Sequence, residues 1–426
     1  MTARILAIGT AVPPAVLRQN AVRDLFASQP GIGRLSQRLV RAAFDASAIE
    51  TRHTVLTGLA EALAPGREPV ASDGGHPRDD ADATTGRLPV IADGALLSPT
   101  TKNRNDAYIA AAPALFAEAA REALAAASVA AADVTHVVTV SCTGMVAPGP
   151  DYRLVRDLGL RTSVERYHLG FVGCAAAVPA LRAAARMCAA DPEAVVLVVC
   201  AELCTLHFRV ADDPDQILAA SLFADGAAAA VVSADPARRG ERWLDLDRFG
   251  TAVTDDGERD MTWTVGDAGF DMVLTAEVPR IIGREIRAAV DDIVGTAPVD
   301  TWAVHPGGRA VLDRVESGLG LAPDALDASR AVLRDHGNMS SATILFILRS
   351  LLGGDALREG ESIATLAFGP GLTMEAAMLT AGIAPGARRA VADARTDAAA
   401  RTDAARTDAA GSPGAARLPE PEPVAS

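Results

Sequence analysis

Cys174 is a candidate nucleophile because of the residues on either side of it. It follows a glycine in FVGCAAAVPAL and comes directly before an alanine-rich stretch with helical character. The unpaired N–H groups and the dipole of a helix start stabilise a thiolate, so this position predicts a thiol with a lowered pKa. Taken alone, Cys174 is better explained as a small buried core residue, because free cysteines are among the most buried residue types.

His305 and Asn338 stand at comparable places in the second half of the chain. In WAVHPGGRAVLD, His305 ends a strand-like stretch before a Pro-Gly-Gly turn, where α/β proteins often carry catalytic groups. In DHGNMSSATILF, Asn338 follows Gly337 at the expected opening of a helix, where its amide can donate a hydrogen bond into a cavity. A lone histidine at a strand end is more often structural, and a lone asparagine there is usually a cap.

The three residues together resemble the Cys-His-Asn constellation of thiolase-like condensing enzymes. Further motifs are similar to those of the type III polyketide synthases, the group that includes chalcone synthase. They are HPGG at His305, GNMSSAT around Asn338, APGPDY at Ala147–Tyr152 and AFGPGLTMEAAML at Ala367–Leu379. The resemblance extends over about residues 5–380 apart from an insertion, and the joint pattern is highly specific.

This resemblance implies an enzyme that extends an acyl-CoA starter with malonyl-CoA and cyclises the chain to a pyrone or resorcinol-type product. Cys174 would carry the chain, while His305 and Asn338 would hold thioester carbonyls and stabilise the enolate left by decarboxylation. No cofactor and no metal are expected, only the coenzyme A thioesters as substrates, and a homodimer is expected. The pattern is closest to actinobacterial members whose relatives make alkylpyrones and alkylresorcinols, which favours a long-chain acyl starter.

The same resemblance predicts residues that shape the cavity. Phe223, in SLFADG, stands where the family has a gatekeeper phenylalanine, and the second gatekeeper aligns with either Phe270 or Met272. Ala367 replaces the first glycine of the family's C-terminal glycine-rich loop, a change expected to matter little. The expected gatekeeper, loop and cavity residues are Phe223, Cys142, Ala147, Cys204, His207, Phe270, Met272, Ser340, Gly369, Pro370 and Gly371.

Two other kinds of protein are compatible with parts of this pattern. A ketoacyl synthase III-like or hydroxymethylglutaryl-CoA synthase-like enzyme also condenses with a cysteine and a histidine, but HPGG, Phe223 and FGPG argue against both. A non-catalytic acyl-CoA-binding homologue would be expected to have lost some of the catalytic groups. Such a homologue would release no coenzyme A from acyl-CoA and malonyl-CoA.

Composition argues against several other classes of protein. The 426 residues carry a net charge of −14, which repels nucleic acid, and no apolar run reaches the roughly 18 to 20 residues of a membrane span. The first apolar stretch breaks at Pro13 and Pro14, too soon for a signal peptide, so a cytoplasmic location is expected. The five cysteines have neither an even number nor zinc-finger spacing, which argues against a disulfide framework and a zinc site.

Alternating strand-like and helix-like stretches must hold the candidate residues in place. Helices are expected at Asp106–Ala127, Ala177–Ala190, Pro279–Val294 and after Gly337, and strands at Val134–Val140, Ala194–Cys200, Gly226–Ser233, Thr301–His305 and Ile363–Phe368. Continuous apolar strands between helices predict a mixed or parallel sheet covered on both faces. The two halves share this plan, and with the resemblance they predict an α/β, thiolase-like duplicated αβαβα layered fold.

The chain is expected to divide into two halves and a tail. The N-terminal half, 1–233, holds the cysteine, and the C-terminal half, 234–386, holds the histidine and the asparagine. An insertion at about residues 60–97 is rich in Gly, Pro and Asp and predicts a surface loop. The tail, 387–426, repeats RTDAA and has almost no large apolar residues, which predicts disorder.

Overall fold

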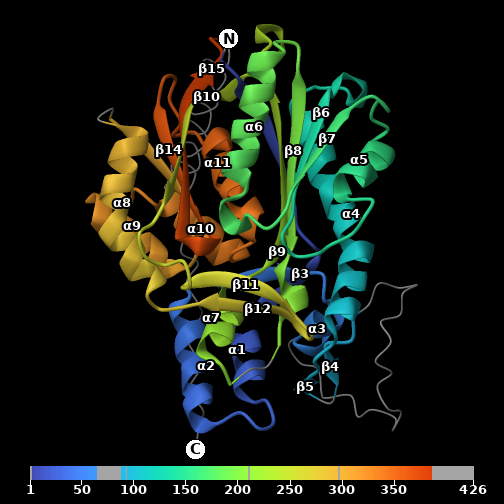
Figure 1. Cartoon of the computed structure of the whole chain (residues 1–426), viewed down its shortest axis with the longest axis vertical. Coiled ribbons are helices and arrows are strands. Elements are labelled where there is room, and N and C mark those ends of the chain that lie inside the picture. The colour runs from blue at the N-terminus through green and yellow to red at the C-terminus, as the bar shows by residue number, and fades with distance from the viewer. Residues whose placement is uncertain (1, 65–87, 93, 210–211, 296–297, 386–426) are drawn as a thin grey trace, which may run out of the picture. The chain divides into compact units, whose positions relative to one another are not determined.

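The computed structural model of this protein describes residues 2–64, 88–92, 94–209, 212–295 and 298–385 (Figure 1). One compact unit runs from Met1 to Gly382, and a second unit, Ile383–Ser426, is described only as far as residue 385. Most of the expected insertion at 60–97 and all of the expected tail at 387–426 lie outside the described residues. None of the helices within the described ranges is long and apolar enough to cross a membrane.

A mixed nine-stranded sheet forms the centre of the first unit, in the order β13-β14-β15-β10-β1-β9-β8-β6-β7. Its strands are β1 (Arg4–Ala11), β6 (His136–Val140), β7 (Glu165–Leu169), β8 (Val195–Leu203), β9 (Asp225–Ser233), β10 (Arg242–Val253), β13 (Thr301–Val304), β14 (Ser362–Gly369) and β15 (Thr373–Ile383). β6 runs parallel to both β7 and β8, and β13 runs parallel to β14. β9 is antiparallel to both of its neighbours, β1 and β8, and β15 is antiparallel to β14. The expected mixed sheet is therefore confirmed.

Three apolar cores fill the space between the sheet and the helices that cover its two faces. The first lies under α4 (Thr101–Ala126), the second around α6 (Ala177–Ala190) and α11 (Thr343–Gly353), and the third under α8 (Val278–Val294) and α9 (Arg309–Leu319). Alternate residues of β8 belong to the first two cores, since side chains on a strand point to opposite faces in turn. A strand buried on both faces needs the continuous apolar sequence that β8 has.

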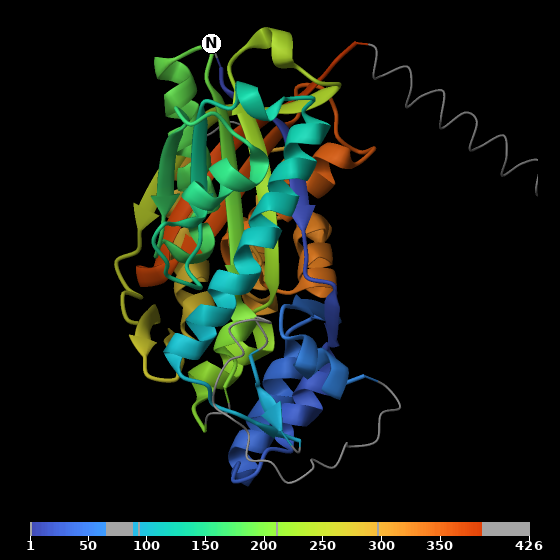
Figure 2. The same cartoon turned by 90° about the vertical axis from the view of Figure 1, so that its right-hand side faces the viewer.

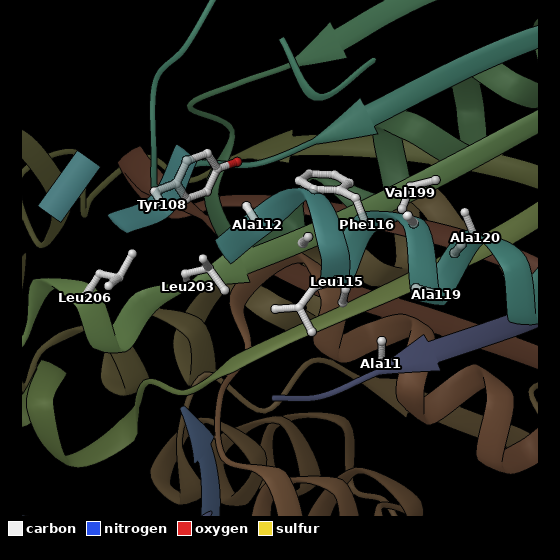
Figure 3. Packing of buried hydrophobic residues seen from close by; sticks show 14 of the residues in the cluster. Ala11, Tyr108, Ala112, Leu115, Phe116, Ala119, Ala120, Val199, Leu203 and Leu206 are labelled. Carbon is white, nitrogen blue, oxygen red and sulfur yellow. The ribbon is translucent and has the colours of Figure 1, made fainter. Parts of the chain in front are cut away.

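Helix α4 shows how closely the first core is packed. Figure 2 shows this helix lying along the outside of the strands, and in Figure 3 Leu115 and Phe116 project from it beside Val199 of β8. Small residues such as Ala119 and Ala120 let the helix backbone approach the sheet, and a Cβ on Gly9 of β1 would lie 2.3 Å from the backbone nitrogen of Ala123. The alanine-rich sequence of α4 is thus required by this close approach.

Smaller elements complete the unit. They are β2 (Ala15–Arg18), α1 (Gln19–Ala27), α2 (Arg34–Ala46), β3 (Thr51–Thr54), α3 (Thr57–Ala62), β4 (Ile91–Ala92), β5 (Ala95–Leu96), α5 (Pro150–Leu158), α7 (Pro214–Leu222), β11 (Met261–Gly266), β12 (Gly269–Leu274) and α10 (Asp327–His336). Strands β11 and β12 form a separate hairpin, which crosses in front of α7 in Figure 1. The hairpin, α7 and the ends of β8, β13 and β14 supply residues to the site described below.

The expected elements are present, with shifted ends. Helix α4 begins at Thr101 rather than Asp106, because the side chain of Thr100 accepts a hydrogen bond from the N–H of Asn103 and caps the helix there. Strand β8 continues past Cys200 to Leu203. Asn338 does not open a helix, since α11 begins only at Thr343 after a short 3-10 turn. The boundary between the two expected halves, near residue 234, stays a prediction.

Candidate active site

One cavity of about 110 Å³ gathers most of the candidate residues. Cys174, His305 and Asn338 all line it, although they come from three separate parts of the chain. Of the expected gatekeeper, loop and cavity residues, those that also line it are Phe223, Cys142, Cys204, His207, Phe270, Met272, Ser340 and Pro370. The lining is mostly apolar, which is typical of a pocket in which a few polar groups orient a small molecule.

Cys174 lies in a tight turn between β7 and α6. The preceding Gly173 has a φ of +72°, and a Cβ there would lie 2.4 Å from Cδ of Pro370, so only glycine fits. The N–H of Gly173 donates to the Sγ of Cys142 (3.2 Å). Cys174 belongs to a short 3-10 turn, Gly173–Ala175, which leads into α6 as the sequence predicts. It is partly exposed, whereas the other cysteines are buried.

The expected lowering of the Cys174 pKa is wrong for the site without substrate. Although Cys174 as a residue is partly exposed to the cavity, its thiol is enclosed by protein atoms, and this burial raises the pKa of the thiol to about 11. Hydrogen bonds with Ser340 and Asn338 act in the opposite direction. The helix start therefore does not outweigh desolvation, which disfavours the charged form in an apolar cavity. Burial also raises the pKa of Cys142, and that of Cys204 well above its ordinary value.

His305 follows β13 and is fully buried within the wall of the cavity. Its backbone N–H donates to the carbonyl of Leu366 (2.8 Å), which fixes the residue to the end of β14. Neither ring nitrogen has a hydrogen-bond partner in the described part of the chain. Burial lowers the pKa of His305 to about 3, so the imidazole is neutral near pH 7 and has one donor and one acceptor nitrogen available.

Asn338 presents its amide in a fixed orientation. Its Oδ1 accepts a hydrogen bond from the backbone N–H of Ser340 (2.8 Å), and the Cys174 Sγ lies 3.9 Å from the same oxygen. A backbone N–H can only donate, so the oxygen must face it and the Nδ2 must face the other way. The side chain is 1% exposed and lines the cavity, which makes this Nδ2 an available donor there.

An aromatic stack forms another wall of the cavity. The rings of His207 and Phe270 lie 3.9 Å apart, those of Phe270 and Trp263 4.7 Å apart, and Trp263 also contacts Phe171 at 5.5 Å. Trp263 and Phe270 belong to the β11–β12 hairpin. The Nε2 of His207 lies 2.9 Å from the carbonyl oxygen of Thr143, and burial lowers the pKa of this imidazole to about 4, so it is neutral near pH 7.

Three of the expected residues do not line the cavity. Ala147 is exposed in the loop between β6 and α5 and does not line the cavity of this chain, so its role at the cavity stays a prediction. Gly369 is buried behind the wall, where a Cβ would lie 2.7 Å from the carbonyl oxygen of Val172. Gly371 has a φ of +70° and turns the chain into β15. The glycines of this loop thus support the turn at Cys174, while Pro370 alone reaches the cavity.

Glu202 is a buried polar residue next to the site that the sequence analysis did not identify. Its carboxylate accepts hydrogen bonds from Ser341 Oγ (2.6 Å), the N–H of Cys142 (2.9 Å) and Thr143 Oγ1 (2.9 Å). Burial raises its pKa to about 7, against these hydrogen bonds. A charged residue within the apolar run VVLVVCAELC was the available signal. Trp263 was missed as well, because no motif surrounds it.

Cys174 should be the first cysteine to react with iodoacetamide, because it alone is partly exposed. With a pKa of about 11, its thiolate fraction and hence its alkylation rate should rise about tenfold per pH unit between pH 7 and 10. Peptide mapping after limiting reagent measures both. A rate that levels off near pH 7 would instead show a thiolate paired with imidazolium His305, and earlier labelling of Cys142 or Cys204 would contradict the order.

Replacing Trp263 should enlarge the cavity. Trp263→Ala removes a ring that is stacked on Phe270. The pairing of β11 with β12 is made by the backbone, so the hairpin does not need this side chain for its strand pairing. We expect the variant to accept longer acyl starters, or to release products with more extension units, than the unaltered protein. Mass spectrometry of the products measures this, with Val265→Ala, at an exposed residue of the same strand that does not line the cavity, as the control. An unchanged product profile would show that Trp263 does not limit the cavity.

The fold and the cavity place this protein in a known family. Family models of the chalcone and stilbene synthases match the chain twice, the N-terminal domain at residues 89–236 and the C-terminal domain at residues 251–383. The chain belongs to this family, the type III polyketide synthases, and has their thiolase-like fold. It is therefore an enzyme of the chalcone synthase family.

Similar proteins come from several groups of eukaryotes. A probable polyketide synthase of Dictyostelium discoideum is 29% identical over 88% of this chain, which spans only 11% of that relative's length. The crystal structure of the C-terminal type III domain of Steely1, a type I/III hybrid from Dictyostelium, is 28% identical, with a TM-score of 0.76 over 90% of this chain and 100% of that one.

Two further solved structures are similar to nearly the same extent. A polyketide synthase from the brown alga Ectocarpus siliculosus is 28% identical, with a TM-score of 0.78 over 89% of this chain and 98% of that one. The fungal type III polyketide synthase ORAS is 25% identical, with a TM-score of 0.73 over 89% of this chain and 100% of that one. The expected closeness to actinobacterial members stays a prediction.

Proposed function

We propose that this protein is an acyltransferase that builds a polyketide on Cys174 by repeated decarboxylative condensation of malonyl-CoA onto an acyl-CoA starter. The observation that carries this proposal is the convergence of Cys174, His305 and Asn338 on one largely apolar cavity. A thiol, a neutral imidazole and a carboxamide donor are the groups that thioester transfer and enolate formation require.

Loading begins with a neutral thiol and a neutral imidazole. As the Cys174 sulfur attacks the starter thioester carbonyl, His305 accepts the thiol proton as a general base, and coenzyme A leaves with a proton. A raised thiol pKa and a lowered imidazole pKa both favour this neutral starting pair. The product of the step is an acyl group bound to Cys174.

Extension uses His305 and Asn338 as hydrogen-bond donors. The thioester carbonyl of malonyl-CoA accepts hydrogen bonds from the imidazole and from Asn338 Nδ2, and loss of carbon dioxide leaves an enolate whose charge these donors stabilise. The enolate carbon then attacks the Cys174 thioester, the bond between the acyl carbon and the Cys174 sulfur breaks, and the released thiolate takes up a proton. The chain, now two carbons longer, is a β-ketoacyl thioester of coenzyme A, which is transferred back to Cys174 by the loading step before the next round. Phe223 and the other apolar residues of the lining keep water from the reactive carbonyls.

The size of the cavity bears on the substrate. A free volume of about 110 Å³ corresponds to roughly 7 to 11 water positions, which suits a short acyl chain better than the long one suggested by the resemblance to alkylpyrone synthases. The identity of the starter, the number of extensions and the pyrone or resorcinol-type ring are all proposed here, and a direct assay of the products tests them. No metal or organic cofactor enters this mechanism.

The decisive experiment incubates the protein with labelled malonyl-CoA and acyl-CoA starters of increasing length and identifies the products by mass spectrometry. Pyrones or resorcinols support the proposal and show the preferred starter length. Coenzyme A release without extended product would show a hydrolase or a different condensing enzyme. No coenzyme A release from any pair would favour a non-catalytic acyl-CoA-binding homologue.

We further propose that the enzyme acts as a homodimer in the cytoplasm. Exposed apolar side chains near the cavity, Met145, Val146 and Phe171, offer a surface that a second copy would cover. Light scattering at micromolar concentration tests the dimer, and a monomeric mass would contradict it. Cell fractionation tests the location.

A further inference from the structure

The N–H of Phe223 still donates to the carbonyl of Ala219 at the end of α7, but beyond this bond the helix end is held by residues distant in the sequence. The N–H of Ala224, which would continue the helix by bonding to Ala220, donates instead to the carbonyl of Asn338 (2.9 Å). The N–H of Asn338 donates to the carbonyl of Leu222 (3.0 Å), so the two segments form an isolated parallel bridge at Phe223. This bridge places the gatekeeper beside the proposed enolate-stabilising amide.

Diverting the chain in this way leaves carbonyl oxygens of α7 without helical partners. Arg52 of β3 supplies the missing donors, because its Nη1 donates to the carbonyls of Ala220 (2.7 Å) and Phe223 (2.8 Å). Gln19 donates to the carbonyl of Ser221 (2.8 Å). A positive charge at a helix C-terminus also interacts favourably with the helix dipole.

Arg52 also supports the other strand of the bridge. Gly337, next to Asn338, has a φ of +71°, and a Cβ there would lie 2.9 Å from Cγ of Arg52 and 3.1 Å from its Cδ. The aliphatic part of Arg52 therefore packs directly against the peptide that carries Asn338. One side chain thus contacts both segments, through hydrogen bonds on one side and van der Waals packing on the other.

The surroundings keep Arg52 charged and in place. Its side chain is fully buried, and its guanidinium lies over the rings of Phe44 (5.7 Å) and Phe208 (5.2 Å). Burial lowers the pKa of Arg52 to about 9, while Asp225 acts in the opposite direction, so the group is charged near pH 7. Asp225 is itself held by the N–H groups of Val55 and Thr205 (both 2.8 Å). No carboxylate of the described residues forms an ion pair with Arg52, which leaves Nη1 free to bind the carbonyls.

We propose that Arg52 is a positioning residue that holds Phe223 and Asn338 in register, and thereby sets how bulky a reagent can reach Cys174 and how fast the extension step runs. This inference rests on the proposed function for its kinetic part, whereas its structural part can be measured on the protein without substrate. Arg52 does not line the cavity. Its effect passes through the bridge between Phe223 and Asn338.

Arg52→Met tests this inference, because it keeps the packing against Gly337 and removes both hydrogen bonds. We expect the rate of malonyl-CoA extension to fall by about 10- to 100-fold, since small displacements of a catalytic group have effects of this size. Loading of Cys174 with the starter, which does not use the Asn338 donor, should change by less than about threefold. Arg52→Lys, which keeps the charge and one donor group, should restore part of the extension rate.

A matched control comes from Arg242, whose Nη1 likewise donates to two carbonyls at a helix C-terminus, those of Leu352 in the last turn of α11 and of Gly354 just after it. Arg242 does not line the cavity. Arg242→Met should therefore lower the melting temperature without separating extension from loading. If both variants lose loading and extension in the same proportion, Arg52 is only a structural residue and the inference is wrong.

Thiol labelling without substrate gives an independent readout. The ratio of Cys174 labelling by a bulky maleimide to labelling by iodoacetamide should rise about threefold or more in Arg52→Met, because Phe223 is no longer held. It should not change in Arg242→Met. If Arg52→Met does not fold, Gln19→Met should show the same rise to a smaller extent, and an unchanged ratio would overturn the inference. Should the unaltered protein make no polyketide, the proposed function fails while this ratio still decides the role of Arg52.

Discussion

A Cys174→Ala variant will bind acyl-CoA but will form neither an acyl enzyme nor an extended product. Alanine keeps the small volume required between Gly173 and α6 and removes the sulfur that accepts the acyl group. Loss of a nucleophile that forms a covalent intermediate lowers turnover by about 10³-fold or more. Intact-mass measurement after incubation with starter alone should show an added acyl group on the unaltered protein and none on the variant.

The control for this variant is Cys188→Ala. Cys188 is a buried thiol of α6 that does not line the cavity, so its replacement should leave both acylation and products unchanged. A Cys174→Ala protein that still made polyketide would overturn the proposed mechanism. An acyl group found on Cys142 or Cys204 would assign the chain to a different sulfur in the same cavity.

Asn338→Ala should separate loading from extension. The variant loses the Nδ2 donor, which faces the cavity because the Ser340 N–H binds Oδ1 on the other side of the amide. Cys174 and His305 remain. Removal of one donor to a developing oxyanion lowers rates by about 10²- to 10³-fold, so malonyl-CoA decarboxylation should fall by this factor. Acyl transfer from the starter to Cys174 should persist within about tenfold, because it uses the thiol and the imidazole.

Two measurements distinguish these steps, carbon dioxide release from labelled malonyl-CoA and the acyl mass on Cys174. Asn20→Ala is the matched control, because within the described residues this exposed side chain accepts a hydrogen bond only from the N–H of Ala21. Equal loss of loading and decarboxylation in Asn338→Ala would mean that the amide holds the site together rather than stabilising the enolate. Unchanged decarboxylation would leave that role to His305 alone.

Local sequence patterns were sufficient for the elements that carry the site. The helix Ala177–Ala190 and the strands expected at Ala194–Cys200 and Thr301–His305 follow from apolar periodicity, which depends on which faces of an element are buried. The structure gives these strands as Val195–Leu203 and Thr301–Val304, so their existence was predictable and their exact ends were not. The motifs around Cys174, His305 and Asn338 indicated the family, which the match to both chalcone and stilbene synthase domains confirms. Patterns of this kind are local, because each residue is judged beside its own neighbours in the chain.

Tertiary structure alone decided the properties that depend on distant contacts. The pKa of Cys174 is raised and not lowered, because desolvation depends on everything that encloses the thiol and not only on the helix that follows it. Trp263 lies in the cavity wall because the hairpin that carries it packs over the cavity. Arg52 donates a hydrogen bond to the carbonyl of Phe223, a residue far away in the sequence. The sequence by itself determined which groups are present and which elements carry them, whereas packing decided their charge, their orientation and the space left for substrate.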